Sequence, residues 1–228
     1  MGAIPTRMMP IGVRKLPYDA EVEYLESNGT QYVDTGIYYE TPMGIYNPTP
    51  IEFQADVSIT KINGQNCVFG CSTVTNRFFL GISQAGKVDL GMGSGIASPN
   101  LAKSIVLGQR YLFRYRLASN RQLWQDGTSL WSGSLQPAPS NVSIWAFGSR
   151  RGPSDSEAYM QARDGWKGRI YSLKIMQGSG YPTVRNFQPV RIGTAGYLYD
   201  RANPTGGPLG NGLYGPATST PLVAGPDK

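Results

Sequence analysis

Histidine is absent from this 228-residue sequence, and cysteine occurs only twice. The lack of imidazole excludes Ser-His-Asp and Cys-His catalysis and most zinc sites. Cys67 and Cys71 are four residues apart, which on a regular strand separates them by about 13 Å, too far for a disulfide. We therefore predict two buried thiols in a reducing compartment. Without histidine, few enzyme mechanisms remain open.

Charged residues are also scarce, at 16% of the sequence, although the net charge is +6. The basic residues form no run with interleaved aromatic residues, so we predict no nucleic-acid groove. No window approaches the roughly 20 apolar residues of a membrane helix. The opening MGAIPTRMMPIGVRKLP also lacks the apolar stretch of a secretory signal. We expect neither membrane insertion nor export through a signal peptide.

The sequence does contain a recurring period of two. From Ile51 to Ile59, apolar residues alternate strictly with polar ones, as in an antiparallel strand with one buried face. The 29 glycines and 17 prolines fall largely between such runs, and helical periodicity appears nowhere over a useful length. This pattern predicts an all-β fold. The same period recurs over residues 67–71, 78–82, 88–92 and 111–117.

Two further strands are predicted from Val142 and from Trp166. In the second of them, Tyr171, Leu173 and Ile175 should share one face, because side chains two residues apart point the same way. Two sheets packed about 10 Å apart should then enclose a single core. Six residues are expected inside it: Phe53, Val57, Phe69, Leu80, Tyr115 and Ile144.

Asp126-Gly127, flanked by apolar residues, predicts a type I′ hairpin, because both central residues of that turn need a positive φ. Trp124 and Trp131 flank the hairpin and are the candidate glycan-binding residues, since indole rings can pack against the C–H faces of sugars. Core packing is the competing role for both, and it is the role expected for Trp145 and Trp166.

Both ends of the chain differ from the middle. Residues 1–20 form an extended arm punctuated by proline, residues 21–202 the sandwich, and residues 203–228 a Gly/Pro-rich loop with a tail that packs on the sandwich or on neighbours. The arm has apolar residues without a helical or strand period, so we expect another chain to bury it. Its assembly residues are predicted to be Arg7, Met8, Met9, Arg14 and Lys15.

Four motifs carry a resemblance to a known family. YLESNGTQYVDTG, from Tyr24 to Gly36, resembles the opening of the laminin G-like and concanavalin A-like jelly-roll domains found in surface proteins of gut bacteria and in virion proteins of tailed phages. GRIYSLKI, FQPVR and GYLYD follow in the family's order. The resemblance covers about residues 21–225 and implies a two-sheet antiparallel jelly-roll sandwich. The chain departs from it at Asn203–Gly212, a Gly/Pro-rich insertion.

One catalytic pattern is present. Glu21, Glu23 and Glu26 have the spacing of the carboxylates in some glucanases of this superfamily, and residues two apart on one strand face can hold the pair that a retaining glycosidase needs. In those enzymes the triplet lies on a central strand, whereas here it lies in the family's opening motif. We therefore expect no enzyme activity.

No metal or cofactor is predicted. Some laminin G-like domains use calcium, but calcium needs six to eight oxygen ligands and the sequence has no D-x-D-x-D loop. The carboxylates in or near predicted loops are isolated: Asp34, Asp126, Asp155 and Asp164.

Three functions compete. The first is a non-enzymatic structural or accessory virion protein of a tailed phage, on the capsid, neck or tail. Its partners would be other virion proteins or copies of itself, with adhesion to cell-surface glycans as a second role. The alternative is a free carbohydrate-binding module, and the third is a glycoside hydrolase that uses the glutamate triplet. The fold alone does not choose among them.

Overall fold

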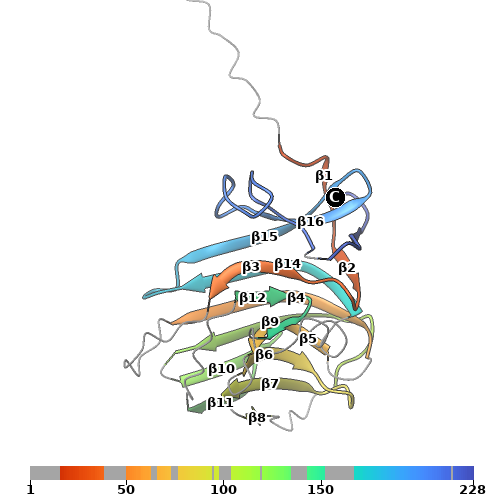
Figure 1. Cartoon of the computed structure of the whole chain (residues 1–228). Helices are drawn as coiled ribbons and strands as arrows, with labels where there is room; N and C mark the ends of the chain where they lie inside the picture. Colours follow the sequence, from red (N-terminus) through yellow and green to blue (C-terminus); the bar gives the residue numbers. More distant parts are fainter. Residues whose placement is uncertain are drawn as a thin grey trace, which may run out of the picture.

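The computed structural model describes residues 16–38, 50–62, 66–72, 77–93, 95–97, 104–118, 120–134, 143–151, 167–216 and 218–228. All regular secondary structure in these ranges is strand, arranged in two sheets (Figure 1). No helix in the described part of the chain is long and apolar enough to cross a membrane.

The larger sheet contains both ends of the described chain. Its strands follow the order β1 (Ala20–Glu21), β15 (Thr183–Ile192), β16 (Ala195–Asp200), β18 (Leu222–Ala224), β2 (Leu25–Asn28), β14 (Lys167–Gln177), β4 (Ile51–Lys61), β9 (Arg110–Leu117), β10 (Asn120–Gln125) and β11 (Thr128–Ser134). β17 (Leu213–Tyr214) adds to β16.

The smaller sheet covers one face of the larger one. Its order is β3 (Val33–Tyr38), β12 (Ser143–Ala146), β5 (Asn66–Ser72), β6 (Arg77–Ile82), β7 (Val88–Gly93) and β8 (Gly95–Ala97). β13 (Ser149–Arg151) pairs with β5 in parallel, and the other pairings described are antiparallel. The predicted two-sheet jelly-roll sandwich is confirmed.

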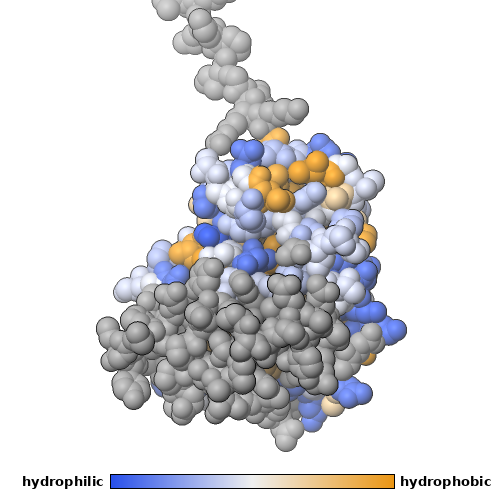
Figure 2. Space-filling model, viewed as in Figure 1, coloured by the Kyte–Doolittle hydropathy of each residue, from blue (hydrophilic) through white to orange (hydrophobic). Residues whose placement is uncertain are grey.

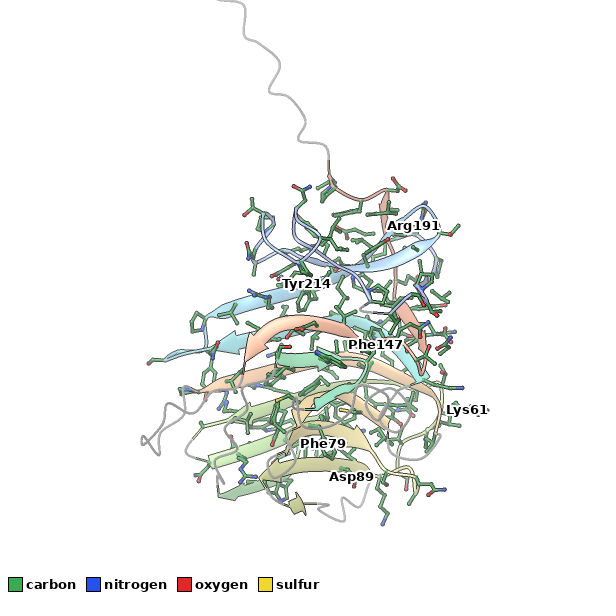
Figure 3. All side chains as sticks on the ribbon, viewed as in Figure 1. Lys61, Phe79, Asp89, Phe147, Arg191 and Tyr214 are labelled. Atoms are coloured by element: carbon green, nitrogen blue, oxygen red, sulfur yellow. The ribbon has the colours of Figure 1, made fainter. Side chains whose placement is uncertain are left out.

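An aromatic cluster joins the two sheets. Phe53 of β4 stacks on Phe69 of β5 with ring centroids 4.7 Å apart, and Phe78 of β6 stacks on Tyr115 of β9 at 5.7 Å. The core continues to β17, where Tyr214 packs edge-on against Phe187 at 4.9 Å (Figure 3). All six residues predicted for the core lie in this one buried cluster.

The predicted alternation of buried and outward-facing side chains is correct in β4 and β9 and wrong in β14. In β14 a register shift between Ile170 and Ser172 inserts an extra residue. As a result Ile170, Leu173 and Ile175 are buried in the core, whereas Tyr171 lies on the outer face beneath the guanidinium of Arg110. The prediction that Tyr171 shares a face with Leu173 and Ile175 is therefore wrong, because a bulge reverses the alternation.

Both cysteines are buried thiols, as predicted. They lie on β5, where a register shift between Cys67 and Phe69 interrupts the pairing with β6. The Cys67 thiol donates to the carbonyl oxygen of Phe69 at 3.2 Å. Neither thiol is joined to the other by a disulfide.

The two ends of the described chain are strands of the larger sheet. β1 pairs with β15, and β18 pairs with both β16 and β2. Arg191 of β15 donates twice to the carboxylate of Asp227 in the tail, at 2.6 and 2.7 Å (Figure 3). The predicted arm residues Arg7, Met8, Met9, Arg14 and Lys15, and also Trp166, lie outside the described residues.

The Asp126-Gly127 turn has the predicted geometry, with φ values of 50° and 78°. It joins β10 to β11, and the Asp126 carboxylate accepts a hydrogen bond from the backbone amide of Leu112. Nothing lies within 4 Å of a Cβ built at Gly127, so a side chain there would strain only the backbone.

Gly127→Ala should therefore lower the free energy of unfolding by about 1 kcal/mol, the usual cost of a left-handed conformation for an L-residue. Urea denaturation would measure it. The control is Ser129→Ala, an exposed change in the same hairpin. Equal stability of the two variants would contradict the turn assignment.

Candidate functional site

The outer face of the larger sheet carries a group of charged and aromatic side chains. Strand alternation places Glu52 and Gln54 on either side of Phe53, and Arg114 and Arg116 on either side of Tyr115. The register pairs Glu52 with Arg116 and Gln54 with Arg114. Because the inner residues are fixed in the core, their neighbours are held on the outer face.

Glu52 is the anchor of this group. Its side chain is 2% exposed, and its two carboxylate oxygens accept hydrogen bonds from Arg114 Nε (2.6 Å), Arg114 Nη2 (2.9 Å) and Arg116 Nε (2.7 Å). Burial alone would raise the pKa of Glu52, but the hydrogen bonds from the two arginines and from Gln54 outweigh it, so the pKa lies below its ordinary value. Glu52 is therefore ionised at neutral pH and holds both guanidinium groups in place.

Trp124 of β10 lies directly opposite Arg114. Its ring centroid is 4.9 Å from Arg114 Cζ and 5.4 Å from Arg116 Cζ, and Arg116 Cζ is also 4.7 Å from the ring of Tyr181. One guanidinium thus lies between two aromatic rings. We call Glu52, Gln54, Arg114, Arg116, Trp124 and Tyr181 the Trp124 face.

The Trp124 face remains open to solvent at its arginines. The side chain of Arg114 is 40% exposed and that of Arg116 is 28% exposed, while Trp124 is half-buried. Glu52 occupies two N–H groups of Arg114 and one of Arg116, and a guanidinium carries five. The face therefore combines aromatic surface with fixed hydrogen-bond donors.

A second group of rings and arginines continues across the same sheet. Arg110 forms a bidentate ion pair with Asp56, and its Cζ lies 4.1 Å from the ring centroid of Tyr171. Tyr171 packs against Tyr24 at 5.6 Å, and Arg169 Cζ lies 4.2 Å from the Tyr24 ring. The outer face is thus lined with cation–π pairs over several strands.

The structure separates the two predicted glycan-binding tryptophans. Trp131 of β11 is the cross-strand partner of Leu123, which is fully buried, and its ring packs against the core. The pairing of β10 with β11 shifts between Leu123 and Trp124. As a result Trp124 points to the outer face of the larger sheet, whereas Trp131 points to the face that packs on the core. Both rings are half-buried, Trp124 on the outer face beside Arg114 and Trp131 against the core.

The period of two over residues 111–117 already indicated that Arg114 and Arg116 point away from the buried face. Part of this site could therefore be predicted from the sequence. It did not indicate that Glu52 lies beside them, because the register between strands more than 50 residues apart in sequence is set by the whole sheet. It also did not indicate which residue of β10 lies opposite Arg114. No sequence pattern indicated that Tyr181 belongs to this site.

The glutamate triplet is not on one strand face. Glu21 ends β1, which pairs with β15, whereas Glu26 is in β2, which pairs with β14. Glu23 lies exposed between the two strands. Arg201 Nη2 contacts Glu21 at 2.5 Å and Arg169 Nε contacts Glu26 at 2.8 Å. The three glutamates therefore do not form the carboxylate pair on one strand face that a retaining glycosidase would need, because β1 ends at Glu21 and β2 begins at Leu25.

The described residues hold no group of three or more carboxylate, thiol or imidazole side chains that could bind a metal ion. Asp34 accepts a hydrogen bond from Ser143 Oγ at 2.8 Å, and Asp126 belongs to the hairpin turn. Asp155 and Asp164 lie outside the described residues.

No protein-family profile and no curated protein matches the chain. Solved structures do. A proposed carbohydrate binding protein from Bacteroides ovatus ATCC 8483 aligns with a TM-score of 0.58 at 10% identity, over 90% of this chain and 60% of that one. Domains LG4-5 of the mouse laminin alpha1 chain align with a TM-score of 0.50 at 17% identity, over 72% and 43%.

The chain has the laminin G-like jelly-roll fold. This agrees with the resemblance in the sequence motifs, while the phage or gut-bacterial context stays a prediction. At sequence identities of 10% and 17%, the similarity shows the fold alone. The matched region is also less than two thirds of either neighbour's length, so the jelly roll corresponds to a part of those proteins.

Glu52→Gln should lower the free energy of unfolding by about 1–3 kcal/mol at pH 7, because two charged hydrogen-bond donors lose a buried anion. Since the pKa of Glu52 is lowered in the folded state, its stabilising contribution is present above the unfolded pKa, about 4.3, and is lost as the pH falls through the folded pKa. Urea unfolding at both pH values should show that the difference in the free energy of unfolding between variant and parent is smaller in acid than at pH 7.

Glu23→Gln is the matched control, since it removes the same charge from an exposed position. It should change stability by less than about 0.5 kcal/mol at either pH. A Glu52→Gln effect that is the same in acid and at pH 7 would show that the ion cluster does not stabilise the fold.

Proposed function

We propose that this chain is a non-catalytic, carbohydrate-binding jelly-roll domain and that the Trp124 face is its binding surface. The observation that carries the proposal is the half-buried ring of Trp124 beside two arginines that a buried carboxylate holds in position.

A pyranose ring presents C–H groups on its faces and hydroxyl groups around its edge. An indole ring provides apolar surface for the C–H groups, and the N–H groups of Arg114 and Arg116 that Glu52 does not occupy can donate to the hydroxyl groups. Glu52 holds both guanidinium groups before a ligand arrives, so little side-chain entropy is lost on binding. Tyr181 adds a second ring beside Arg116.

One of the comparison structures has a description that names the same class of ligand. The Bacteroides ovatus protein, which aligns with 90% of this chain, is described as a proposed carbohydrate binding protein. Similarity at 10% identity establishes the fold, so the extension to sugars here rests on the Trp124 face itself.

The two other functions have less support. The glutamates predicted for a glycosidase lie on different strands and are engaged by different arginines. The virion role stays a prediction together with its partners and localisation. The five residues predicted for its assembly arm lie outside the described residues. A virion protein that adheres to cell-surface glycans would be compatible with the site.

A glycan array probed with the full chain should identify a ligand, and titration calorimetry should then show that Trp124→Ala weakens binding at least tenfold, about 1.4 kcal/mol. Trp131→Phe is the control, because it keeps an aromatic ring packed against the core and leaves Trp124 and its arginines unchanged. Thermal unfolding of both variants checks that they are folded. Absence of any glycan ligand, or equal affinity of Trp124→Ala and the parent, would refute the proposal.

A further inference from the structure

The outer face of the larger sheet repeats one arrangement of side chains. In each case a carboxylate holds an arginine, and the arginine lies beside an aromatic ring. The three groups are Glu52 with Arg114 and Trp124, Asp56 with Arg110 and Tyr171, and Glu26 with Arg169 and Tyr24. We call the second and third groups together the Tyr171 face. A repeated arrangement of this kind is suited to a ligand that has repeated units.

The Tyr171 face is open to solvent. The side chains of Arg110 and Arg169 are 58% and 36% exposed, and both Tyr24 and Tyr171 are half-buried. Asp56 occupies two N–H groups of Arg110, and a guanidinium carries five. Arg110 can therefore donate to a ligand from a position that an ion pair and a ring fix, as the arginines of the Trp124 face can.

The Tyr171 face and the Trp124 face lie on one continuous surface. β2, β14, β4, β9 and β10 are consecutive in the sheet, so Tyr24, directly before β2, and Trp124 of β10 are four strand spacings apart, about 19 Å. Leu112 lies on the outer face of β9 between Arg110 and Arg114, and it is 46% exposed. A ligand that touches both faces must therefore pass over Leu112 and be longer than one sugar ring.

The charges of the Tyr171 face favour a neutral ligand that is rich in hydroxyl groups. Each arginine there has a carboxylate of its own, so these side chains together have no net charge. A nucleic acid or another polyanion would meet the carboxylates of Asp56 and Glu26 as well as the guanidinium groups, and would gain little from counterion release. A sugar hydroxyl can accept from an arginine and donate to a carboxylate.

The outer face is less suited to a protein partner, because the centre of a protein interface is apolar and depleted in charge. Leu112 is the only exposed large hydrophobic residue of β4, β9, β10 and β14 that the structure describes. In the view of Figure 2, hydrophobic surface gathers over the upper part of the molecule, where Figure 1 places β15 and β16. The rings and charge pairs of the outer face suit a hydrated sugar chain better.

We infer that the ligand of this domain is a linear polysaccharide that extends from the Trp124 face over Leu112 to the Tyr171 face, where its sugar units are neutral. This inference rests on the proposed carbohydrate function and specifies its ligand. The domain binds internal units of a chain and not a single terminal sugar. One unit packs beside Trp124, and later units exchange hydrogen bonds with Arg110 and Asp56.

The first experiment is titration calorimetry of the full chain with neutral linear oligosaccharides from cellulose, xylan, mannan, starch and chitin, each from the disaccharide to the hexasaccharide. At least one series should bind, and its hexasaccharide should bind about tenfold more tightly than its disaccharide, because only the longer chain reaches the Tyr171 face. Equal affinity at both lengths overturns the inference. Binding of the acidic hexasaccharide of hyaluronan, with none of the neutral series, also overturns it.

The second experiment tests the two faces separately. Tyr171→Ala should remove the gain in affinity with chain length, whereas Trp124→Ala should weaken binding at every length. Tyr171→Phe is the matched control and should behave like the parent, because it keeps the ring beside Arg110 and removes the hydroxyl alone. Thermal unfolding of each variant checks that it is folded.

Leu112→Glu tests the path between the faces without disturbing the core, because Leu112 is exposed. It should lower the affinity for the hexasaccharide about tenfold. Leu209→Glu is the matched control and should have no effect, since Leu209 is 57% exposed in the loop after β16.

The outcomes distinguish this inference from the proposed function. If Tyr171→Ala and Leu112→Glu keep the gain with chain length while Trp124→Ala loses binding, the extension is wrong and the Trp124 face remains the binding surface. The same holds if the parent binds a terminal sugar on the glycan array and none of the linear series. If the parent binds no carbohydrate of any kind, the proposed function fails together with the inference.

Discussion

The aromatic contact between the two sheets is the constraint on which the rest of the structure depends. Phe53 and Tyr115 from the larger sheet meet Phe69 and Phe78 from the smaller one, and all four are buried. Because side chains alternate along a strand, fixing Phe53 and Tyr115 inside the sandwich also fixes their sequence neighbours outside it. The Trp124 face is thus a direct consequence of the core.

Glu52 is the one place on this face where a charge is buried. A carboxylate removed from water is costly unless it is paired and hydrogen-bonded, and here two arginines and Gln54 provide the pairing. Such a cluster adds less stability than an apolar residue of the same size could. Its benefit is positional, since it holds two guanidinium groups beside Trp124 in a single arrangement.

The ends of the chain build a separate region. β1 and β18 enter the larger sheet, and the insertion after β16 folds over a small core of its own around Tyr199. The larger sheet thereby carries two distinct regions, the Trp124 face and the small second core with the loop that follows β16. The jelly roll permits this because its strand ends and loops vary while its core stays the same.

The sequence by itself determined the properties that depend on near neighbours. The alternation of apolar and polar residues identified β4 and β9, the Asp126-Gly127 pair identified the hairpin, and the absence of histidine removed most catalytic chemistry. The motifs from Tyr24 onward indicated the jelly roll.

The tertiary structure alone decided which distant residues meet. The bulge in β14 moved Tyr171 to the outer face, the register shift in β10 separated Trp124 from Trp131, and the pairing of β4 with β9 brought Glu52 to Arg114 and Arg116. The physical reason is that side-chain alternation is a local property of the chain. Bulges and strand register are set by how all the strands of a sheet fit together, and a shift of one residue moves a side chain to the other face.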